Sequence, residues 1–176
     1  MKYFKKMTGA KCYLSPISLD DAARYTEWLN DTEVTRNLSI SGMNITLNSE
    51  LEILEKISKE HNYAIVDLNS DMLIGTVGLT AIDQRQGTAE IGVFIGDKSY
   101  WNKGYGEEAM RLLLRYAFDY LNLRNIMLRV FDYNKAGIRC YEKIGFKEIG
   151  KRRNAIRLQM KEHDLIFMDI LNDELN

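Results

Sequence analysis

A glycine-containing segment placed directly before a long helical pattern is the first feature of the sequence that could do chemistry. The segment KGYG (103–106) runs without a break into an amphipathic pattern that continues to Phe118. The first N–H groups of a helix have no partner within the helix and lie at the positive end of its dipole. Glycines before such a helix let a ligand approach the backbone closely, so the segment predicts an anion site suited to a phosphate group.

A nucleotide-hydrolysing P-loop is one reading of this segment. That motif requires GxxxxGK[ST], in which the lysine follows the second glycine and a Ser or Thr follows to hold Mg²⁺. Here Lys103 precedes the first glycine, and no Ser or Thr follows the glycines to hold Mg²⁺. The segment is therefore not predicted to hydrolyse ATP or GTP.

A dinucleotide-binding turn is the second reading. Gly104, Gly106 and Ala109 satisfy GxGxx[GA], and Asp132 ends the next strand pattern, where such folds place a ribose-binding acid. In that fold the first glycine follows its strand almost directly, whereas here residues 96–103 intervene. An antiparallel meander precedes the motif and little chain follows it, so NAD or FAD binding is the weaker hypothesis.

Glu90 is a candidate proton acceptor. It lies in the strand pattern TAEIGVFI (88–95), on the face opposite Ala89 and Ile91, in a segment without other charges. A carboxylate in this place could remove a proton from an ammonium substrate, directly or through a water molecule. An ion pair with a nearby Arg or Lys is an equally good explanation.

Length and composition limit the number of domains and the class of protein that can hold these residues. The chain has 176 residues, 45% of them hydrophobic and 28% charged, with a formal net charge of −1. This predicts one globular domain over 1–176, with no overall charge signal for nucleic acid or a membrane surface. No signal-peptide-like or membrane-spanning apolar run is present, so we expect a cytoplasmic protein. The two Cys and two His have no metal-ligand spacing, and no metal is expected.

Hydrophobic periodicity predicts a mixed α/β sheet with the order βααβββαβαββ. Helices are expected over 19–30, 47–60, 134–145 and the long pattern after KGYG, and strands over the seven ranges 11–16, 63–68, 72–82, 88–95, 125–131, 147–159 and 164–171. Residues 31–46 have no clear period and are expected to form a loop or a broken helix. The long helix is expected to bury one face made of Ala109, Leu112, Leu113, Tyr116, Ala117 and Tyr120.

Two consecutive stretches resemble a known family. YWNKGYGEEA (100–109) and YAFDYLNLRNIMLRVFDYNKAGIRCYEKIGFKEIG (116–150) are similar to the acetyl-CoA-binding half of the GNAT superfamily of N-acetyltransferases. The likeness is greatest to the branch with ribosomal-protein N-terminal and polyamine (spermidine) acetyltransferases. It covers about 11–172 in element order and is specific over 89–150. The signature [QR]xxGx[GA] falls on 101–106, with Trp101 in place of Gln or Arg.

The resemblance implies a fold and a cosubstrate. It implies a mainly antiparallel central sheet of about seven strands with helices on both faces, in which strand 88–95 runs parallel to strand 125–131 and splays from it. Acetyl-CoA would bind by its pyrophosphate at the glycine segment, with Lys103 adding charge, and by its pantetheine arm at the splay. The residues implied to contact it are Val93, Phe94, Ile95, Asn102, Lys103, Gly104, Tyr105, Gly106, Glu107, Asn134 and Lys143.

Two of these residues also have purely structural explanations. Asn134 is a good helix cap, and one side chain can serve both as a cap and as a ligand of the CoA arm. Lys143 recurs with Lys135 and Arg139 at helical spacing, which is also typical of a solvated face.

Tyr141 aligns with the tyrosine that the family uses as a general acid toward the CoA sulfur. By spacing alone it would be a core residue, because Ile138, Tyr141 and Ile144 share one helix face. A phenol keeps its proton at neutral pH and can donate it to a departing thiolate. The neighbouring Cys140 raises the alternative of a covalent acetyl-cysteine, but its side chain points about 100° away around the helix.

The amine acceptor is less well indicated. Acidic groups among Trp28, Asp31, Glu33 and Arg36 would favour a polyamine, whereas Arg152, Arg153 and Arg157 would favour an acceptor that carries a carboxylate or phosphate. The expected acceptors are a protein or peptide N-terminus, then a polyamine, then an amino sugar or aminoglycoside. A homodimer is possible, and a catalytically silent acyl-CoA sensor is the alternative to an enzyme.

Overall fold

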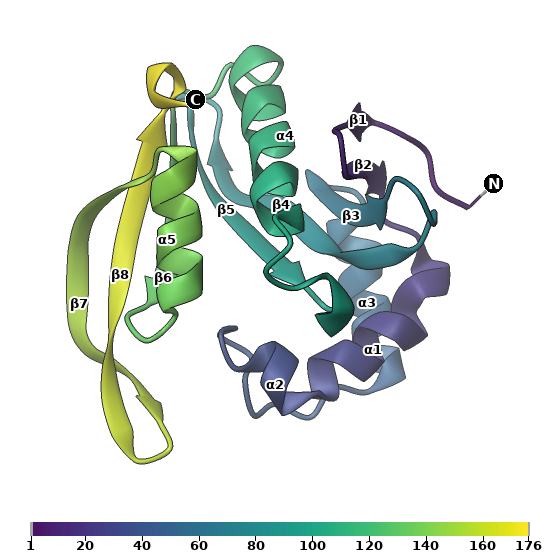
Figure 1. Ribbon diagram of the computed structural model, residues 1–176, viewed down its shortest axis with the longest axis horizontal. Coiled ribbons are helices and arrows are strands. Elements are labelled where there is room, and N and C mark those ends of the chain that lie inside the picture. The colour runs from purple at the N-terminus through teal and green to yellow at the C-terminus, as the bar shows by residue number, and fades with distance from the viewer. Residues whose placement is uncertain (1, 176) are drawn as a thin grey trace. The chain divides into compact units, whose positions relative to one another are not determined.

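The strands of the computed structural model, which describes residues 2–175, pair in the order β1-β2-β3-β4-β5-β6-β8-β7 (Figure 1). The β5–β6 pair is parallel. The pairs β1–β2, β2–β3, β3–β4, β6–β8 and β7–β8 are antiparallel. The prediction of a mixed, mainly antiparallel sheet with one parallel pair is confirmed.

The chain forms two compact units. The first comprises residues up to 79 together with 92–113, and the second comprises 80–91 together with residues from 114 onward. Strands β4 and β5 and helix α4 each contribute residues to both units. One acetyltransferase domain over 1–176 stays a prediction.

The strands of the first unit are β1 (Met7–Thr8), β2 (Cys12–Pro16), β3 (Asn62–Asp67), the start of β4 (Leu73–Asp83) and the end of β5 (Thr88–Ile95). In β3, five consecutive residues are buried. A strand that is apolar on both faces requires cover on both faces of its sheet. The two-residue strand β1 was not predicted, because a segment this short has no readable period.

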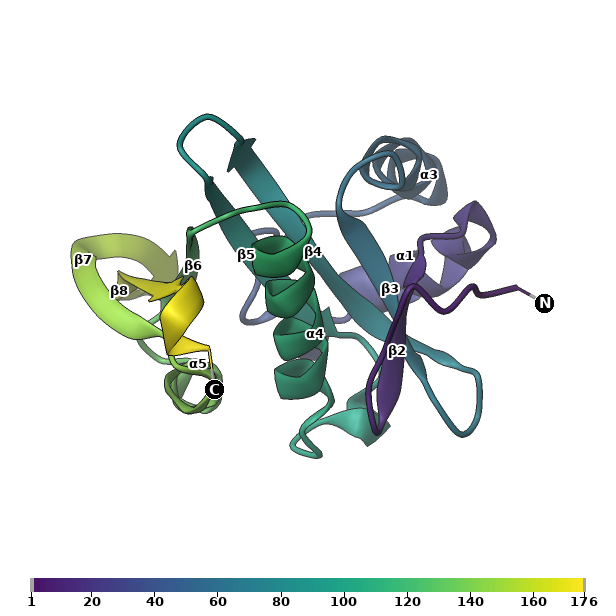
Figure 2. The same cartoon turned by 90° about the horizontal axis from the view of Figure 1, so that it is seen from above.

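Helices α1 (Ala22–Asn30) and α3 (Leu47–Ile57) lie on the same side of β3 (Figure 2). The short 3-10 turn η1 (Leu19–Asp21) leads into α1, and Ser18 caps it. Helix α3 begins with a capping box in which Thr46 and Ser49 satisfy each other's backbone N–H groups. The stretch predicted to be irregular contains the one-turn helix α2 (Thr32–Thr35), which fits a broken helix.

One cluster of buried residues joins these helices to one face of β2, β3 and β4. Two of its aromatic members, Tyr25 and Trp28, pack edge to face, with ring centroids 5.7 Å apart. Burial of such large side chains is the main favourable contribution to folding. The cluster consists of Tyr3, Tyr13, Ile17, Ala22, Tyr25, Trp28, Val34, Leu54, Ala64, Val66 and Leu73.

Helix α4 (Tyr105–Asp119) follows the 3-10 turn η2 (Lys98–Tyr100) and the glycine segment. Its buried residues are Ala109, Met110, Leu113, Leu114 and Ala117. The prediction that Tyr120 belongs to the buried face of this helix is wrong. Tyr120 follows the last residue of α4 and is 74% exposed. Its ring stacks on Tyr116 at 5.4 Å instead of entering the core.

The second unit contains β6 (Asn125–Phe131), α5 (Lys135–Ile144), β7 (Lys147–Leu158) and β8 (Lys161–Leu171). Helix α5 runs alongside β6 and β8, and β7 and β8 form a long hairpin (Figure 1). The 3-10 turn η3 (Asn172–Glu174) follows β8. Strand β8 begins at Lys161, three residues before its predicted start at Asp164. The hairpin ladder continues to the pair Leu158 and Lys161.

Candidate functional site

The glycine segment forms a turn that the end of β5 holds in place. The indole Nε1 of Trp101 donates a hydrogen bond to the Ile95 carbonyl at 2.8 Å. Asn102 and Gly104 have φ angles of 57° and 84°, in the left-handed region that favours glycine and asparagine. The N–H of Glu108 makes the first helical hydrogen bond, to Gly104 O at 3.1 Å, so the N–H groups of residues 105–107 precede that bond.

Tyr105 ties this turn to the β3–β4 connection. Its hydroxyl donates to Asp67 Oδ1 at 2.8 Å, and Asp67 Oδ2 accepts from the N–H and the hydroxyl of Ser70 at 2.9 and 2.7 Å. Burial by itself would raise the pKa of Asp67, but these hydrogen bonds outweigh it and lower that pKa. The bond to Asp67 in turn raises the pKa of Tyr105 to about 12, so the phenol stays a donor.

A second set of hydrogen bonds connects the turn to the β1–β2 connection, near the N-terminus. Lys11 Nζ donates to the Lys103 carbonyl at 2.7 Å, and the Glu108 carboxylate accepts from the backbone N–H groups of Ala10 and Lys11. Sequence reasoning missed Lys11 and Glu108 as partners of the glycine segment. The contact spans more than 90 residues, and no local pattern marks such a pair.

The predicted β5 residues split between the two units. The parallel ladder joins Thr88–Glu90 to Asn125–Met127, and the predicted direction of this pair is thereby confirmed. Strand β5 continues to Ile95 and β6 to Phe131. Val93, Phe94 and Ile95 belong to the first unit and are each partly buried. Their role toward a pantetheine arm stays a prediction.

Glu90 forms an ion pair across the parallel strands. Arg129 Nε donates to Glu90 Oε1 at 2.6 Å, and the two side chains are 53% and 20% exposed, respectively. The ion pair is the structural alternative that the sequence left open. A role of Glu90 as a base stays a prediction, and it would require the carboxylate to exchange this partner for a substrate or water proton.

Helix α5 carries the predicted acid and begins as the sequence indicates. Asn134 caps it, accepting from the Gly137 N–H at 3.0 Å, and the helix ends at Gly145. Burial, followed by the neighbouring Cys140, raises the pKa of Tyr141 to about 12. The Tyr141 ring packs edge to face on Phe146, with centroids 6.1 Å apart. Lys143 lies on the exposed side near the end of α5.

The second unit contains an Asp132–His163 pair that the sequence did not predict. His163 Nδ1 lies 3.0 Å from Asp132 Oδ1, and Asp132 Oδ2 accepts from the Asp164 N–H at 3.2 Å. Asp164 Oδ1 accepts from the Asn154 N–H at 2.9 Å, across the bulge of the β7–β8 hairpin. Asp132, the ribose acid of the dinucleotide hypothesis, therefore fastens β8 to the end of β6.

The acidic residues considered for amine recognition are already paired. Lys98 Nζ lies 2.7 Å from Asp31 Oδ2 and 2.5 Å from Glu33 Oε2. This ammonium partly offsets the negative charge that the polyamine hypothesis requires. Among the arginines, Arg153 lines an open hollow of about 700 Å³ with Asn154 and Asp164.

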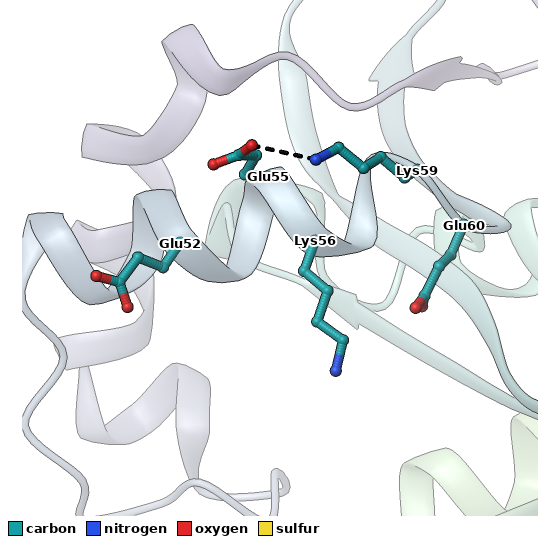
Figure 3. A pocket seen from close by; sticks show the side chains of 5 residues that line it. All are labelled: Glu52, Glu55, Lys56, Lys59 and Glu60. Carbon is teal, nitrogen blue, oxygen red and sulfur yellow. Dashed lines mark hydrogen bonds and ion pairs between the residues drawn. The ribbon is translucent and has the colours of Figure 1, made fainter.

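A second hollow, of about 420 Å³, lies on the surface of α3 and the residues after it. Figure 3 shows its five lining side chains, with Lys56 and Glu60 on one side of the helix and the Glu55–Lys59 pair on another. That pair is separated by 3.1 Å and has helical i, i+4 spacing. Such pairs are common on solvated helices, and this hollow holds none of the predicted site residues.

Residues 2–175 contain neither a metal-binding cluster nor a helix that could span a membrane. Among residues 2–175, no three His, Cys, Asp or Glu side chains come together in a group able to hold a metal ion. Within the same residues, no helix is both long enough and apolar enough to cross a membrane.

Sequence comparison connects the chain with known proteins. The model of the family described as "Acetyltransferase (GNAT) domain" matches residues 11–147. The probable N-acetyltransferase YjcK of Bacillus subtilis is 30% identical over 96% of this chain and 98% of its own length. The N-acetyltransferase p20 of Bacillus licheniformis is 28% identical over 92% of this chain and 93% of its own length.

Solved structures share the fold. A GNAT-family acetyltransferase from Bacillus anthracis superposes with a TM-score of 0.84 at 22% identity, covering 96% of this chain and 99% of its own. The spermidine N-acetyltransferase from Vibrio cholerae, solved with CoA and spermine, superposes with a TM-score of 0.85 at 22% identity. That match covers 94% of this chain and 98% of the Vibrio chain.

Proposed function

The chain belongs to the GNAT family of acetyltransferase enzymes, and from this premise we propose that it transfers an acetyl group from acetyl-CoA directly to a primary amine. The observation that carries the proposal is the glycine turn at the start of α4, inside the matched region 11–147. Its backbone N–H groups precede the first helical hydrogen bond, as a phosphate site at a helix start requires.

The cosubstrate contacts are assigned residue by residue from the family resemblance. The N–H groups of 102–107 bind the pyrophosphate, with Lys103 at the rim. The backbone of 93–95 and the side chain of Asn134 bind the pantetheine arm, and Lys143 adds positive charge near a CoA phosphate. The Vibrio cholerae structure was solved with CoA, which supports this choice of ligand.

The proposed reaction has one nucleophilic step. Glu90, directly or through a water molecule, removes a proton from the ammonium form of the acceptor. The neutral amine then attacks the thioester carbonyl carbon, the C–S bond breaks, and the nitrogen releases its second proton to solvent. Tyr141 donates its proton to the departing thiolate, which leaves as the CoA thiol. Its pKa of about 12 keeps the phenol protonated at the start of each cycle.

The proposed acceptor is a protein or peptide N-terminus, before a polyamine or an amino sugar. The pairing of Asp31 and Glu33 with Lys98 supports this order, because a polyamine site needs acidic groups whose charge is not already offset. We place the enzyme in the cytoplasm, and a homodimer is consistent with the proposal.

The test is a screen of CoA-thiol release with acetyl-CoA and a panel of peptides, polyamines and aminoglycosides. Turnover above background with at least one amine supports the enzyme. Binding of acetyl-CoA without turnover on any amine would favour a sensor, the second candidate. Tight NAD binding together with no acetyl-CoA binding would exclude both proposals.

A further inference from the structure

We propose that Lys11 is a pyrophosphate-binding residue of this enzyme, and that Glu108 is the positioning residue that brings Lys11 to the glycine turn. The inference rests on the proposed function, since it takes the turn to hold the CoA pyrophosphate. It adds the β1–β2 connection, which precedes the turn by about 90 residues, to the phosphate site.

The position of the Lys11 ammonium carries the proposal. Nζ lies 2.7 Å from Lys103 O, and a Cβ added at Gly104 would lie 3.2 Å from Nζ. The ammonium is therefore held against the same backbone whose N–H groups are proposed to bind the pyrophosphate. Gly104 has a φ of 84° and no side chain, which leaves room for this approach.

The chemistry of an ammonium group suits an anion in this place. Lysine has three N–H donors, and one of them is directed at the Lys103 carbonyl. The Lys11 side chain is exposed, so a phosphate can reach it from solvent. The hydrogen bond to the Lys103 carbonyl already holds the flexible Lys11 side chain beside the turn. Less side-chain conformational entropy is therefore lost when the ammonium binds a phosphate.

Glu108 determines where Lys11 lies. Its two carboxylate oxygens accept from the Lys11 N–H at 3.1 and 3.0 Å, and Oε1 also accepts from the Ala10 N–H. Any Cβ at Gly9 would collide with this carboxylate. The β1–β2 connection is thus fastened to the first turn of α4, and Lys11 extends from it to the glycine turn.

Two opposing effects make the role of Glu108 testable. Its negative charge lies near the proposed anion site, so electrostatics alone predicts that removing the charge strengthens CoA binding. If Glu108 acts through Lys11, removing the whole side chain weakens CoA binding. Glu108→Gln keeps an acceptor oxygen for the Lys11 N–H and should rescue most of the affinity.

The experiment is calorimetric titration of the full chain with CoA and with dephospho-CoA, which lacks the 3′-phosphate and keeps the pyrophosphate. For Lys11→Gln we expect affinity to fall about tenfold for both ligands, with an unchanged thermal midpoint. Lys56→Gln, an exposed lysine on α3, is the matched control and should bind both ligands as the unchanged chain does. Glu108→Ala should weaken both ligands, and Glu108→Gln should bind more tightly than Glu108→Ala.

Three results would overturn the inference. Lys11→Gln could bind both ligands within twofold of the unchanged chain, or lose affinity for CoA alone, which would assign Lys11 to the 3′-phosphate. Glu108→Ala could bind CoA more tightly, which would show that only its charge matters. Failure of the unchanged chain to bind either ligand would instead overturn the proposed function, so the two failures are distinguishable.

Discussion

Tyr141 shows how one side chain can satisfy a structural and a chemical explanation together. Its ring packs on Phe146 within the second unit, as a core residue would, and burial raises its pKa to about 12. A phenol in this state holds its proton throughout the neutral pH range. Tyr141 is partly buried, so its packing on Phe146 and its retained proton fit the structural and the chemical explanation alike.

We predict that Tyr141→Phe lowers kcat by about 100-fold or more and leaves CoA affinity within about twofold, because general acid catalysis is worth about 10²–10⁴ in rate. The measurement is steady-state kinetics with the best amine of the panel, combined with calorimetry. Tyr120→Phe, on a 74% exposed ring, is the control and should change neither quantity. Unchanged kcat in Tyr141→Phe would remove the acid assignment.

At the scale of elements, α5 depends on Asn134, the residue that caps its start. The helix has ten residues, and short helices are marginal without caps and tertiary packing. Asn134 supplies the cap by accepting from the Gly137 N–H, and the family resemblance also assigns it to the CoA arm. The two roles can be separated by choosing the substitution.

Asn134→Ala should lower the free energy of unfolding by about 1 kcal/mol, because the cap is lost. Asn134→Asp retains the cap and should leave the free energy of unfolding nearly unchanged, while its charge weakens acetyl-CoA binding. Urea denaturation and calorimetry measure the two effects. Equal CoA affinity in the Asp variant and the unchanged chain would assign Asn134 to the cap alone.

The glycine turn shows which parts of an element the sequence could not reveal. Gly104, Gly106 and the following amphipathic helix are local features, and their interpretation needed only backbone chemistry. The partners of the turn come from distant parts of the chain: Asp67 ends β3, and Lys11 lies in the β1–β2 connection. Only the fold brings them to the turn, so no pattern of spacing predicts them.

At the scale of the whole molecule, hydrophobic periodicity predicted the succession of helices and strands, whereas the parallel pairing of β5 and β6 was implied by the family resemblance and is confirmed. It did not predict the two-residue β1 or the exposure of Tyr120. It also left the role of Glu90 open, because the partner Arg129 lies on a neighbouring strand. Elements follow from local pattern, whereas side-chain partners follow from tertiary structure.

Stability of the molecule should depend on pH through Glu50, a residue of α3 that sequence reasoning did not single out. The residue is 2% exposed, and within residues 2–175 its Oε2 is buried without a hydrogen-bond partner. Burial raises the pKa of Glu50 from 4.5 to about 7 in the folded chain. Between these values the unfolded chain releases the proton while the folded chain keeps it, so stability falls as pH rises.

We expect the free energy of unfolding to fall by about 3 kcal/mol between pH 4.5 and pH 7 through this group, and no further above pH 7. Glu50→Gln has no proton to release, so its stability should vary less over this window. Denaturation at a series of pH values measures the slope. Glu55→Gln, on an exposed residue of the same helix, should keep the slope of the unchanged chain. Equal slopes in Glu50→Gln and the unchanged chain would contradict the assignment.

The hydrogen bond from Trp101 to Ile95 has an optical consequence. The chain has two tryptophans, and the other, Trp28, is 4% exposed and packed among aromatic rings. The emission of Trp28 should therefore respond little to a ligand. Trp101 lies within the turn, with its indole N–H held by a backbone carbonyl. Fluorescence of the Trp28→Phe chain thus reports on occupancy of the turn alone, without an added label.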